Sequence, residues 1–220
     1  MKIFKDRQSA GQILARRLKN VRADLVLGIP RGGVVVAYQV AKELNLFLDI
    51  LVTRKIGAPN QPELALGAVD GDGSVVWDQE LLTQLKLKIE SVNLAEKIED
   101  ERNEISRREK IYRQGRLPLD VKNKTIILTD DGIATGSTTL AAINYLRRHQ
   151  AGKVILAVPV ASKEAKNKII REFGEFGGFG EIIILETPED FQAVGQFYHQ
   201  FEPVEDEKVI TLLERASSSQ

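Results

Sequence analysis

The chain has 220 residues, which is enough for one substantial α/β domain with an elaboration. Hydrophobic residues make up 43% and charged residues 28%, so a disordered or collagen-like chain is excluded. The 31 Lys and Arg residues balance 31 Asp and Glu residues, and this zero net charge argues against wholesale binding of nucleic acid or an anionic membrane. A local basic patch is still compatible with this balance.

Cysteine is absent, and histidine occurs only at His149 and His199. A disulfide, a thiol nucleophile and a cysteine zinc site are therefore excluded, and two histidines leave little for a histidine metal cluster. The first residues are charged where a signal peptide would be apolar, and no apolar run approaches the roughly 18 residues of a membrane span. We expect a cytoplasmic protein without a membrane partner.

Strands and helices are expected to alternate along most of the chain. Asp6 is the expected N-cap of a first helix, whose apolar residues line one face. The unbroken apolar run 25–29 then predicts a strand buried on both faces, followed by a glycine turn at 30–33 and a helix over 34–44. Further strands are predicted at 48–53, 125–129, 154–160 and 182–185, with one helix ending near Arg148 and another over 162–173. The predicted fold class is α/β, with a mostly parallel sheet flanked by helices.

Two stretches interrupt this alternation. Residues 64–69 and 74–77, joined by Asp-Gly-Asp-Gly, are typical of a hairpin because glycine allows the positive φ of a tight turn. The highly charged stretch 79–113 predicts one or two inserted amphipathic helices, with either a solvated face or a partner-binding arm. The glycines of 174–180 precede a strand, so a surface loop is expected there rather than a dinucleotide site.

These elements predict a single domain over residues 1–216. It would carry a charged helical insertion, or hood, at about 79–116. A disordered tail is expected at 217–220, where the residues are small and polar.

The chemistry is concentrated in residues 125–139, Thr-Ile-Ile-Leu-Thr-Asp-Asp-Gly-Ile-Ala-Thr-Gly-Ser-Thr-Thr. The strand ends on Asp130 and Asp131, at the edge where open α/β sheets bind ligands. The turn and helix start after it offer backbone N–H groups to a phosphate, together with the hydroxyls of Thr135, Ser137 and Thr138. The two acids would repel a triphosphate but can accept hydrogen bonds from sugar hydroxyls. The pattern indicates a ribose 5-phosphate, whereas helix capping alone would leave these groups unexplained.

This segment closely resembles the phosphoribosyl pyrophosphate (PRPP) signature of the type I phosphoribosyltransferases. That signature is a hydrophobic strand, two acids, three variable residues, Thr-Gly and small hydroxyl residues, and it lacks the Gly-Lys-Ser/Thr ending of a P-loop. Residues 28–33 look like the family's pyrophosphate loop. Other stretches resemble a bacterial subgroup of predicted phosphoribosyltransferases, so the similarity covers nearly the whole chain: 4–7, 54–59, 63–69, 107–108 and 191–201.

The resemblance implies Mg²⁺-dependent transfer of the 5-phosphoribosyl group of PRPP to a nitrogen nucleophile, such as a nucleobase, with release of pyrophosphate. The implied catalytic residues are Asp130, Asp131, Arg54 and Lys55, because charge builds on both halves of PRPP as the bond breaks. The implied binding residues are Arg31, Gly32, Gly33, Ala134, Thr135, Gly136, Ser137 and Thr138. Substrate oxygens and water would hold most of the Mg²⁺, so no dedicated protein metal site is expected.

The resemblance does not specify the acceptor. Family members that act on 6-oxopurines carry an acid at the position of Ala134, so the usual 6-oxopurine reaction is disfavoured. A general base would then come from elsewhere, and Glu63 is either that base or an ordinary exposed loop acid. Residues 159–163 lie where the family usually contacts its base, but they match no particular base.

The basic stretch 54–67 is expected to be a lid, since few large apolar side chains anchor it. The insertion would then form either a hood wall beside the cleft or a dimer contact, so a homodimer stays open. Two other functions stay open as well. One is a non-catalytic sensor of PRPP or of a nucleotide, and the other is a phosphatase or kinase of phosphorylated sugars.

Overall fold

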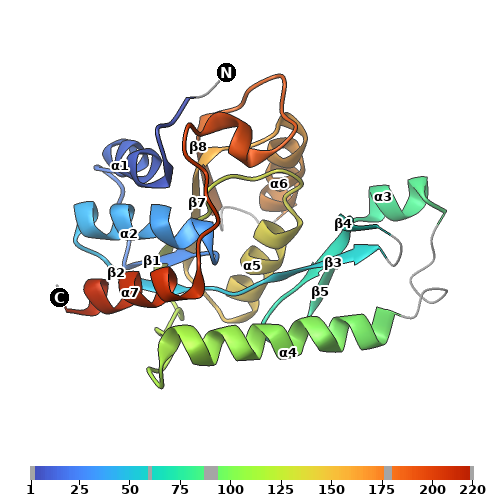
Figure 1. Cartoon of the computed structure of the whole chain (residues 1–220), viewed down its shortest axis with the longest axis horizontal. Coiled ribbons are helices and arrows are strands. Elements are labelled where there is room, and N and C mark those ends of the chain that lie inside the picture. Colours follow the sequence, from blue (N-terminus) through green and yellow to red (C-terminus); the bar gives the residue numbers. More distant parts are fainter. Residues whose placement is uncertain (1–2, 59–60, 87–93, 176–179, 219–220) are drawn as a thin grey trace.

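A five-stranded parallel sheet forms the centre of the molecule (Figure 1). The computed structural model describes residues 3–58, 61–86, 94–175 and 180–218, apart from the side chains of 61–63, 94 and 173–175. The strand order is β2-β1-β6-β7-β8, and every neighbouring pair is parallel. The strands are β1 (Leu25–Gly28), β2 (Phe47–Ile50), β6 (Thr125–Thr129), β7 (Lys153–Val160) and β8 (Gly180–Glu186). The predicted fold class is confirmed.

Helices cover both faces of this sheet, because alternate strand residues point to opposite sides. Val26 and Ile127 pack against α1 (Arg7–Arg17) and α2 (Gly32–Leu44) on one face. Leu27 and Leu128 pack against α5 (Ser137–Arg148) and α6 (Lys163–Glu175) on the other. The predicted start of the first helix is confirmed, since the Asp6 carboxylate accepts a hydrogen bond from the backbone N–H of Ser9 at 2.6 Å.

A second, antiparallel sheet contains β3 (Arg54–Ala58), β4 (Gln61–Val69) and β5 (Val75–Trp77). The predicted hairpin is confirmed as the pair β4–β5, with Gly73 at φ +82° in its turn. The expectation of a lid without anchorage is wrong for the described part of 54–67. There β3 pairs with β4, and Ile56 and Leu66 are fully buried, so packing holds this ribbon against the rest of the molecule. Residues 59–60 lie outside the described residues.

The charged insertion contains α3 (Gln79–Gln84) and the long helix α4 (Leu94–Arg113). The buried Ile105 and Tyr112 of α4 share one apolar cluster with Ile56 of β3 and with Val209 and Leu213 of α7 (Asp206–Ser217). Helix α4 therefore lies along the second sheet and ends beside α7 (Figure 1).

The prediction of a disordered tail at 217–220 is wrong at its first residue, because helix α7 continues to Ser217. Ser217 is its last residue, and the helix is anchored by the buried Leu212 and Leu213, so order extends past the predicted boundary at residue 216. Residues 219–220 lie outside the described part, as do 176–179 of the predicted glycine-rich loop. Within the described ranges, no helix has both the length and the apolar character to span a bilayer.

Candidate active site

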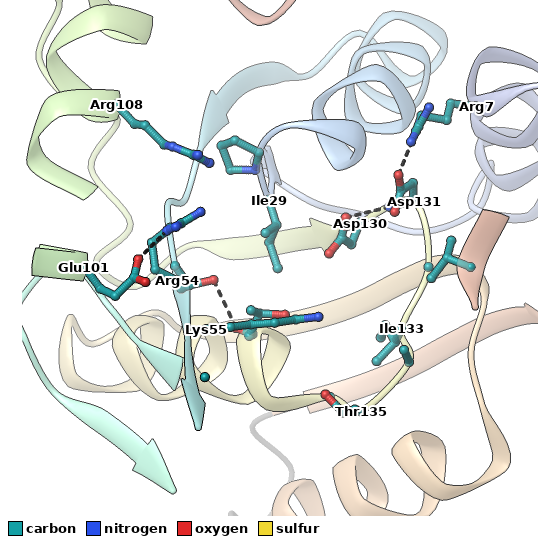
Figure 2. Close-up of a pocket in the computed structure, with 18 of the residues that line it drawn as sticks. Arg7, Ile29, Arg54, Lys55, Glu101, Arg108, Asp130, Asp131, Ile133 and Thr135 are labelled. Atoms are coloured by element: carbon teal, nitrogen blue, oxygen red, sulfur yellow. Dashed lines mark hydrogen bonds and ion pairs between the residues drawn. The ribbon is translucent and has the colours of Figure 1, made fainter. Parts of the chain in front are cut away.

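A cavity of about 570 Å³ opens at the carboxyl ends of β1 and β6. Its wall comes from the turn after β1, from β3, α4 and the loop between β6 and α5, and from the chain near Val194 and Phe201 (Figure 2). This volume is ordinary for a small-molecule site. Eight of the predicted site residues line it: Arg54, Lys55, Asp130, Asp131, Ala134, Thr135, Gly136 and Thr138.

The two adjacent acids of the cavity have different partners. Oδ2 of Asp131 accepts a hydrogen bond from Nε of Arg7 at 2.6 Å, and these side chains are only 15% and 11% exposed. The backbone oxygen of Asp131 also accepts from the Tyr198 hydroxyl at 2.5 Å. Asp130 is half-buried, and its Oδ1 accepts the backbone N–H of Asp131 at 2.8 Å. One carboxylate is therefore held in a salt bridge, while its neighbour is held by a backbone N–H (Figure 2).

The surroundings of the two acids act differently on their pKa values. Burial raises the pKa of Asp130 well above its usual value, and the charge of Asp131 raises it further. Burial also raises the pKa of Asp131, but there the Arg7 guanidinium opposes the effect. The Arg7 guanidinium therefore favours the ionised form of Asp131, whereas burial and the neighbouring carboxylate disfavour the ionised form of Asp130.

The start of α5 forms the floor of the cavity below the acids. Gly136 is the N-cap at φ +82°, and no side chain caps this helix end. The hydroxyl of Ser137 is buried and finds no hydrogen-bond partner within the described ranges. An uncapped helix N-terminus at the wall of a cavity is a favourable place for an anion.

Cationic side chains gather on another wall of the cavity. Arg54 and Lys55 come from β3, and Lys97 and Arg108 come from α4. Nε of Arg54 donates to Oε2 of Glu101 at 2.6 Å, which ties β3 to α4. Figure 2 shows Lys55 extending across the cavity from this wall. The cavity therefore offers separate regions to an anionic group and to hydroxyl groups.

Four predicted residues, Arg31, Gly32, Gly33 and Ser137, do not line the cavity. The expected place of Arg31 on its wall is not observed, because its guanidinium pairs with Glu205 at 3.5 Å and Asp206 at 3.7 Å beside α7.

The two glycines lie behind the acids instead. A Cβ at Gly33 would lie 2.8 Å from Cα of Asp130, and a Cβ at Gly32 would overlap the Asp131 carboxylate. Glycine at both positions therefore lets the acids take their places, whereas contact of these residues with pyrophosphate stays a prediction.

The predicted base-contact segment 159–163 does not line the cavity either. It supports the loop after β6: the Ser162 hydroxyl donates to the backbone oxygen of Ala134 at 2.7 Å, and the N–H of Ile133 donates to the backbone oxygen of Val160 at 2.9 Å. The side chain of Glu63 lies outside the described part, so its role as a general base stays a prediction.

Arg7, Arg108 and Phe201 line the cavity but were not among the predicted site residues. The guanidinium carbon of Arg7 lies 3.7 Å from the centroid of the Phe201 ring, and its Nη1 donates to the backbone oxygen of Glu202 at 2.9 Å. One feature of the sequence pointed to these three residues: they belong to stretches that resemble the same bacterial subgroup, namely 4–7, 107–108 and 191–201. Their meeting at one cavity depends on tertiary contacts between distant segments.

Known proteins resemble this chain over most of its length. The family model described as phosphoribosyl transferase domain matches residues 5–173. Two proteins of Mycobacterium tuberculosis, from strains CDC 1551 and H37Rv, are each named "Putative phosphoribosyl transferase" and are 41% identical over 218 residues, or 98% of this chain. The chain spans only 47% of the length of each of these relatives.

Solved structures show the same fold. The crystal structure of TT1426 from Thermus thermophilus is 38% identical, with a TM-score of 0.78 over 98% of this chain and 99% of that one. A hypothetical protein of Neisseria gonorrhoeae with bound ppGpp shares the fold alone, at 14% identity and a TM-score of 0.51, over 98% of this chain and 97% of its own. Because the family match covers every segment of the cavity wall except the one near Val194 and Phe201, the chain belongs to the phosphoribosyl transferase domain family.

Proposed function

We propose that this chain transfers the 5-phosphoribosyl group of PRPP to a nitrogen nucleophile, with Mg²⁺ and with release of pyrophosphate. The observation that carries the proposal is a juxtaposition in one cavity. Asp130 and Asp131 lie beside the uncapped start of α5, and Arg54 and Lys55 line the same space. A phosphate at the helix start would place neutral sugar hydroxyls near the acids and a second anionic group near the cations.

The reaction would proceed by displacement at C1 of the ribose. The nucleophile forms a bond to C1, the bond from C1 to the pyrophosphate oxygen breaks, and the pyrophosphate leaves with the electron pair. Arg54 and Lys55 would stabilise the negative charge that grows on the leaving group. Asp130 and Asp131 would hold the ribose hydroxyls and favour the positive charge that grows on the sugar ring. Arg7 would fix the orientation of Asp131 through the 2.6 Å contact.

The donor groups at the cavity fit a magnesium ion carried by the substrate. Mg²⁺ prefers oxygen ligands and keeps several waters, and the carboxylate of Asp130 offers such oxygens. In the described part of the chain, no group of three His, Cys, Asp or Glu side chains could hold a metal ion. Phosphate oxygens and water would supply the remaining ligands of the ion in this proposal. The bound ion would neutralise charge on the departing pyrophosphate.

The acceptor in this proposal is a nitrogen heterocycle other than a 6-oxopurine. Ala134 lines the cavity at the position where family members acting on 6-oxopurines carry an acid. Apolar side chains, among them Ile133, Val194 and Phe201, also line it, and they favour a flat ring over a small charged amine.

Mg²⁺-PRPP is expected to raise the melting temperature of the protein. A ligand that binds only the folded state, at one hundred times its dissociation constant, stabilises that state by about 2.7 kcal/mol. For a chain of this size the increase is about 5–10 °C. Differential scanning calorimetry with and without Mg²⁺-PRPP measures this shift.

Pyrophosphate release from Mg²⁺-PRPP, assayed with a panel of nucleobases and small amines, tests turnover and identifies the acceptor. Failure to bind PRPP and ribose 5-phosphate at millimolar concentration, with Mg²⁺ present, would overturn the proposal. Binding of PRPP without pyrophosphate release for any acceptor would favour the alternative, a sensor on the same fold.

A further inference from the structure

One face of the inserted helix α4 forms part of the cavity wall. Lys97, Glu101 and Arg108 line the cavity, and Glu104 pairs with Arg108. These four residues follow one another at spacings of four, three and four, which places them on one side of an α-helix. Figure 2 shows Glu101 and Arg108 reaching toward the cavity from this helix, next to Arg54. The insertion therefore contributes side chains to the candidate active site itself.

Polar contacts with Asp206 of α7 hold the part of α4 that carries Arg108 in place. The Tyr112 hydroxyl of α4 donates to Oδ1 of Asp206 at 2.6 Å, and Arg107 pairs with Oδ2 at 3.7 Å. Arg31, at the start of α2, pairs with the same carboxylate at 3.7 Å. This part of α4 is therefore held beside the turn after β1, which contributes Pro30 to the cavity wall. Arg108 belongs to the end of the cavity formed by that turn.

The arginines at this end are each paired with a glutamate of α4. Nε of Arg54 donates to Glu101 at 2.6 Å, and Nε of Arg108 donates to Glu104 at 2.7 Å. Hydrogen bonds from Arg107 and Arg108 lower the pKa of Glu104 to about 2, so this glutamate is charged at neutral pH. A guanidinium carries five N–H donors, so one contact through Nε leaves Arg108 with further donors for a ligand.

The chemistry of this end suits a diphosphate. Two planar guanidinium groups can each bind two phosphate oxygens, and two linked phosphates present enough oxygens for both. The acids and the α5 floor belong to the other parts of the substrate, so the diphosphate is the group left for Arg54 and Arg108.

We propose that Arg108 of the inserted helix binds the pyrophosphate group, together with Arg54 of β3, so that α4 is a wall of the PRPP site. This inference rests on the proposed function and adds a ligand-binding residue from outside the PRPP signature. It also assigns the charged insertion a role in substrate binding.

Calorimetric titration of Arg108→Gln with Mg²⁺-pyrophosphate and, separately, with ribose 5-phosphate tests the proposal. The affinity for pyrophosphate is expected to fall at least about tenfold, because a charge-assisted contact is lost. The affinity for ribose 5-phosphate is expected to stay within about twofold, because that ligand uses the α5 end and the acids. Unchanged ribose 5-phosphate binding also shows that the variant is folded.

Arg107→Gln is the matched control. Arg107 is on the same helix and pairs with the same Glu104 at 2.7 Å, but it is 48% exposed and does not line the cavity. Both affinities of this variant are expected to stay within about twofold of the wild type. Pyrophosphate affinity that is unchanged in Arg108→Gln, or reduced equally in both variants, would overturn the inference. If the wild-type protein bound neither ligand, the proposed function would fail with it, and that result is distinct from the other two.

Discussion

Asp130→Asn and Asp131→Asn are each expected to lower kcat by about 100-fold, and Asp130→Asn is expected to have the higher melting temperature of the two variants. Asp131→Asn removes the charge that pairs with Arg7 at 2.6 Å and leaves a guanidinium only 11% exposed without its anion. Burial raises the pKa of Asp131 despite Arg7, so loss of its charge also removes a desolvation cost. These two effects oppose each other, and the melting temperature of Asp131→Asn is expected to stay within about 4 °C of the wild type.

Asp130→Asn is expected to raise the melting temperature instead. Burial and the Asp131 charge raise the pKa of Asp130, so its ionised form is less stable in the folded protein than in the unfolded chain. Asparagine removes that charge, and its amide oxygen can keep the hydrogen bond from the backbone N–H of Asp131.

The stabilisation by Asp130→Asn depends on pH in a definite direction. Below the ordinary aspartate pKa, both the folded and the unfolded wild type are protonated at Asp130, and the difference vanishes. As pH rises through the raised pKa of the folded protein, the wild type loses stability and the variant does not. Melting curves between pH 4 and neutral pH, at constant ionic strength, measure this difference. A lower melting temperature for Asp130→Asn at neutral pH would show that the ionised Asp130 carboxylate does not destabilise the folded protein.

Both variants are expected to affect kcat more than KM, because the acids act most strongly once the sugar becomes cationic. Steady-state kinetics with PRPP as the varied substrate separate the two constants. A change confined to KM in either variant would show that the acid binds substrate without stabilising the transition state.

Gly136→Val is expected to weaken the binding of Mg²⁺-PRPP at least about tenfold. Gly136 has φ +82°, where a β-branched residue is strongly disfavoured. The nearest atoms to an added Cβ are those of Ile169 at 3.6 Å, so the side chain itself would fit. The effect therefore comes from the backbone. Valine would turn φ to a negative value and move the N–H groups of the first turn of α5 away from the phosphate.

Gly115→Val separates this effect from strain alone. Gly115 has φ +84°, with no atom within 4 Å of an added Cβ, and it lies outside the cavity wall. Both variants are expected to lose a similar amount of stability, about 1–3 kcal/mol. Only Gly136→Val is expected to lose PRPP affinity in calorimetric titration. Normal PRPP binding by Gly136→Val would show that the loop before α5 does not hold the phosphate.

Local patterns in the sequence were sufficient to predict the parallel sheet and the loop between β6 and α5, which contributes several residues to the cavity wall. Apolar runs such as 25–29 and 125–129 can be recognised from neighbouring residues, because burial on both faces requires consecutive apolar side chains. Asp130, Thr135 and Gly136 belong to the same short loop after β6, so chain connectivity alone places them together at the end of that strand. The β4–β5 hairpin was equally local, since an Asp-Gly turn joins two short strands.

Contacts between distant segments were decided only by the tertiary structure. Arg7 and Asp131 are 124 residues apart, and no periodicity relates them. Arg54 was expected in an open loop, yet pairing of β3 with β4 and the contact with Glu101 hold it at the cavity wall. Arg31 lies in the turn after β1 and was expected at the cavity wall. Its guanidinium instead pairs with the carboxylates of Glu205 and Asp206 at the start of α7. The direction of a long charged side chain depends on which opposite charge the fold brings within reach, and that choice is made by packing rather than by local sequence.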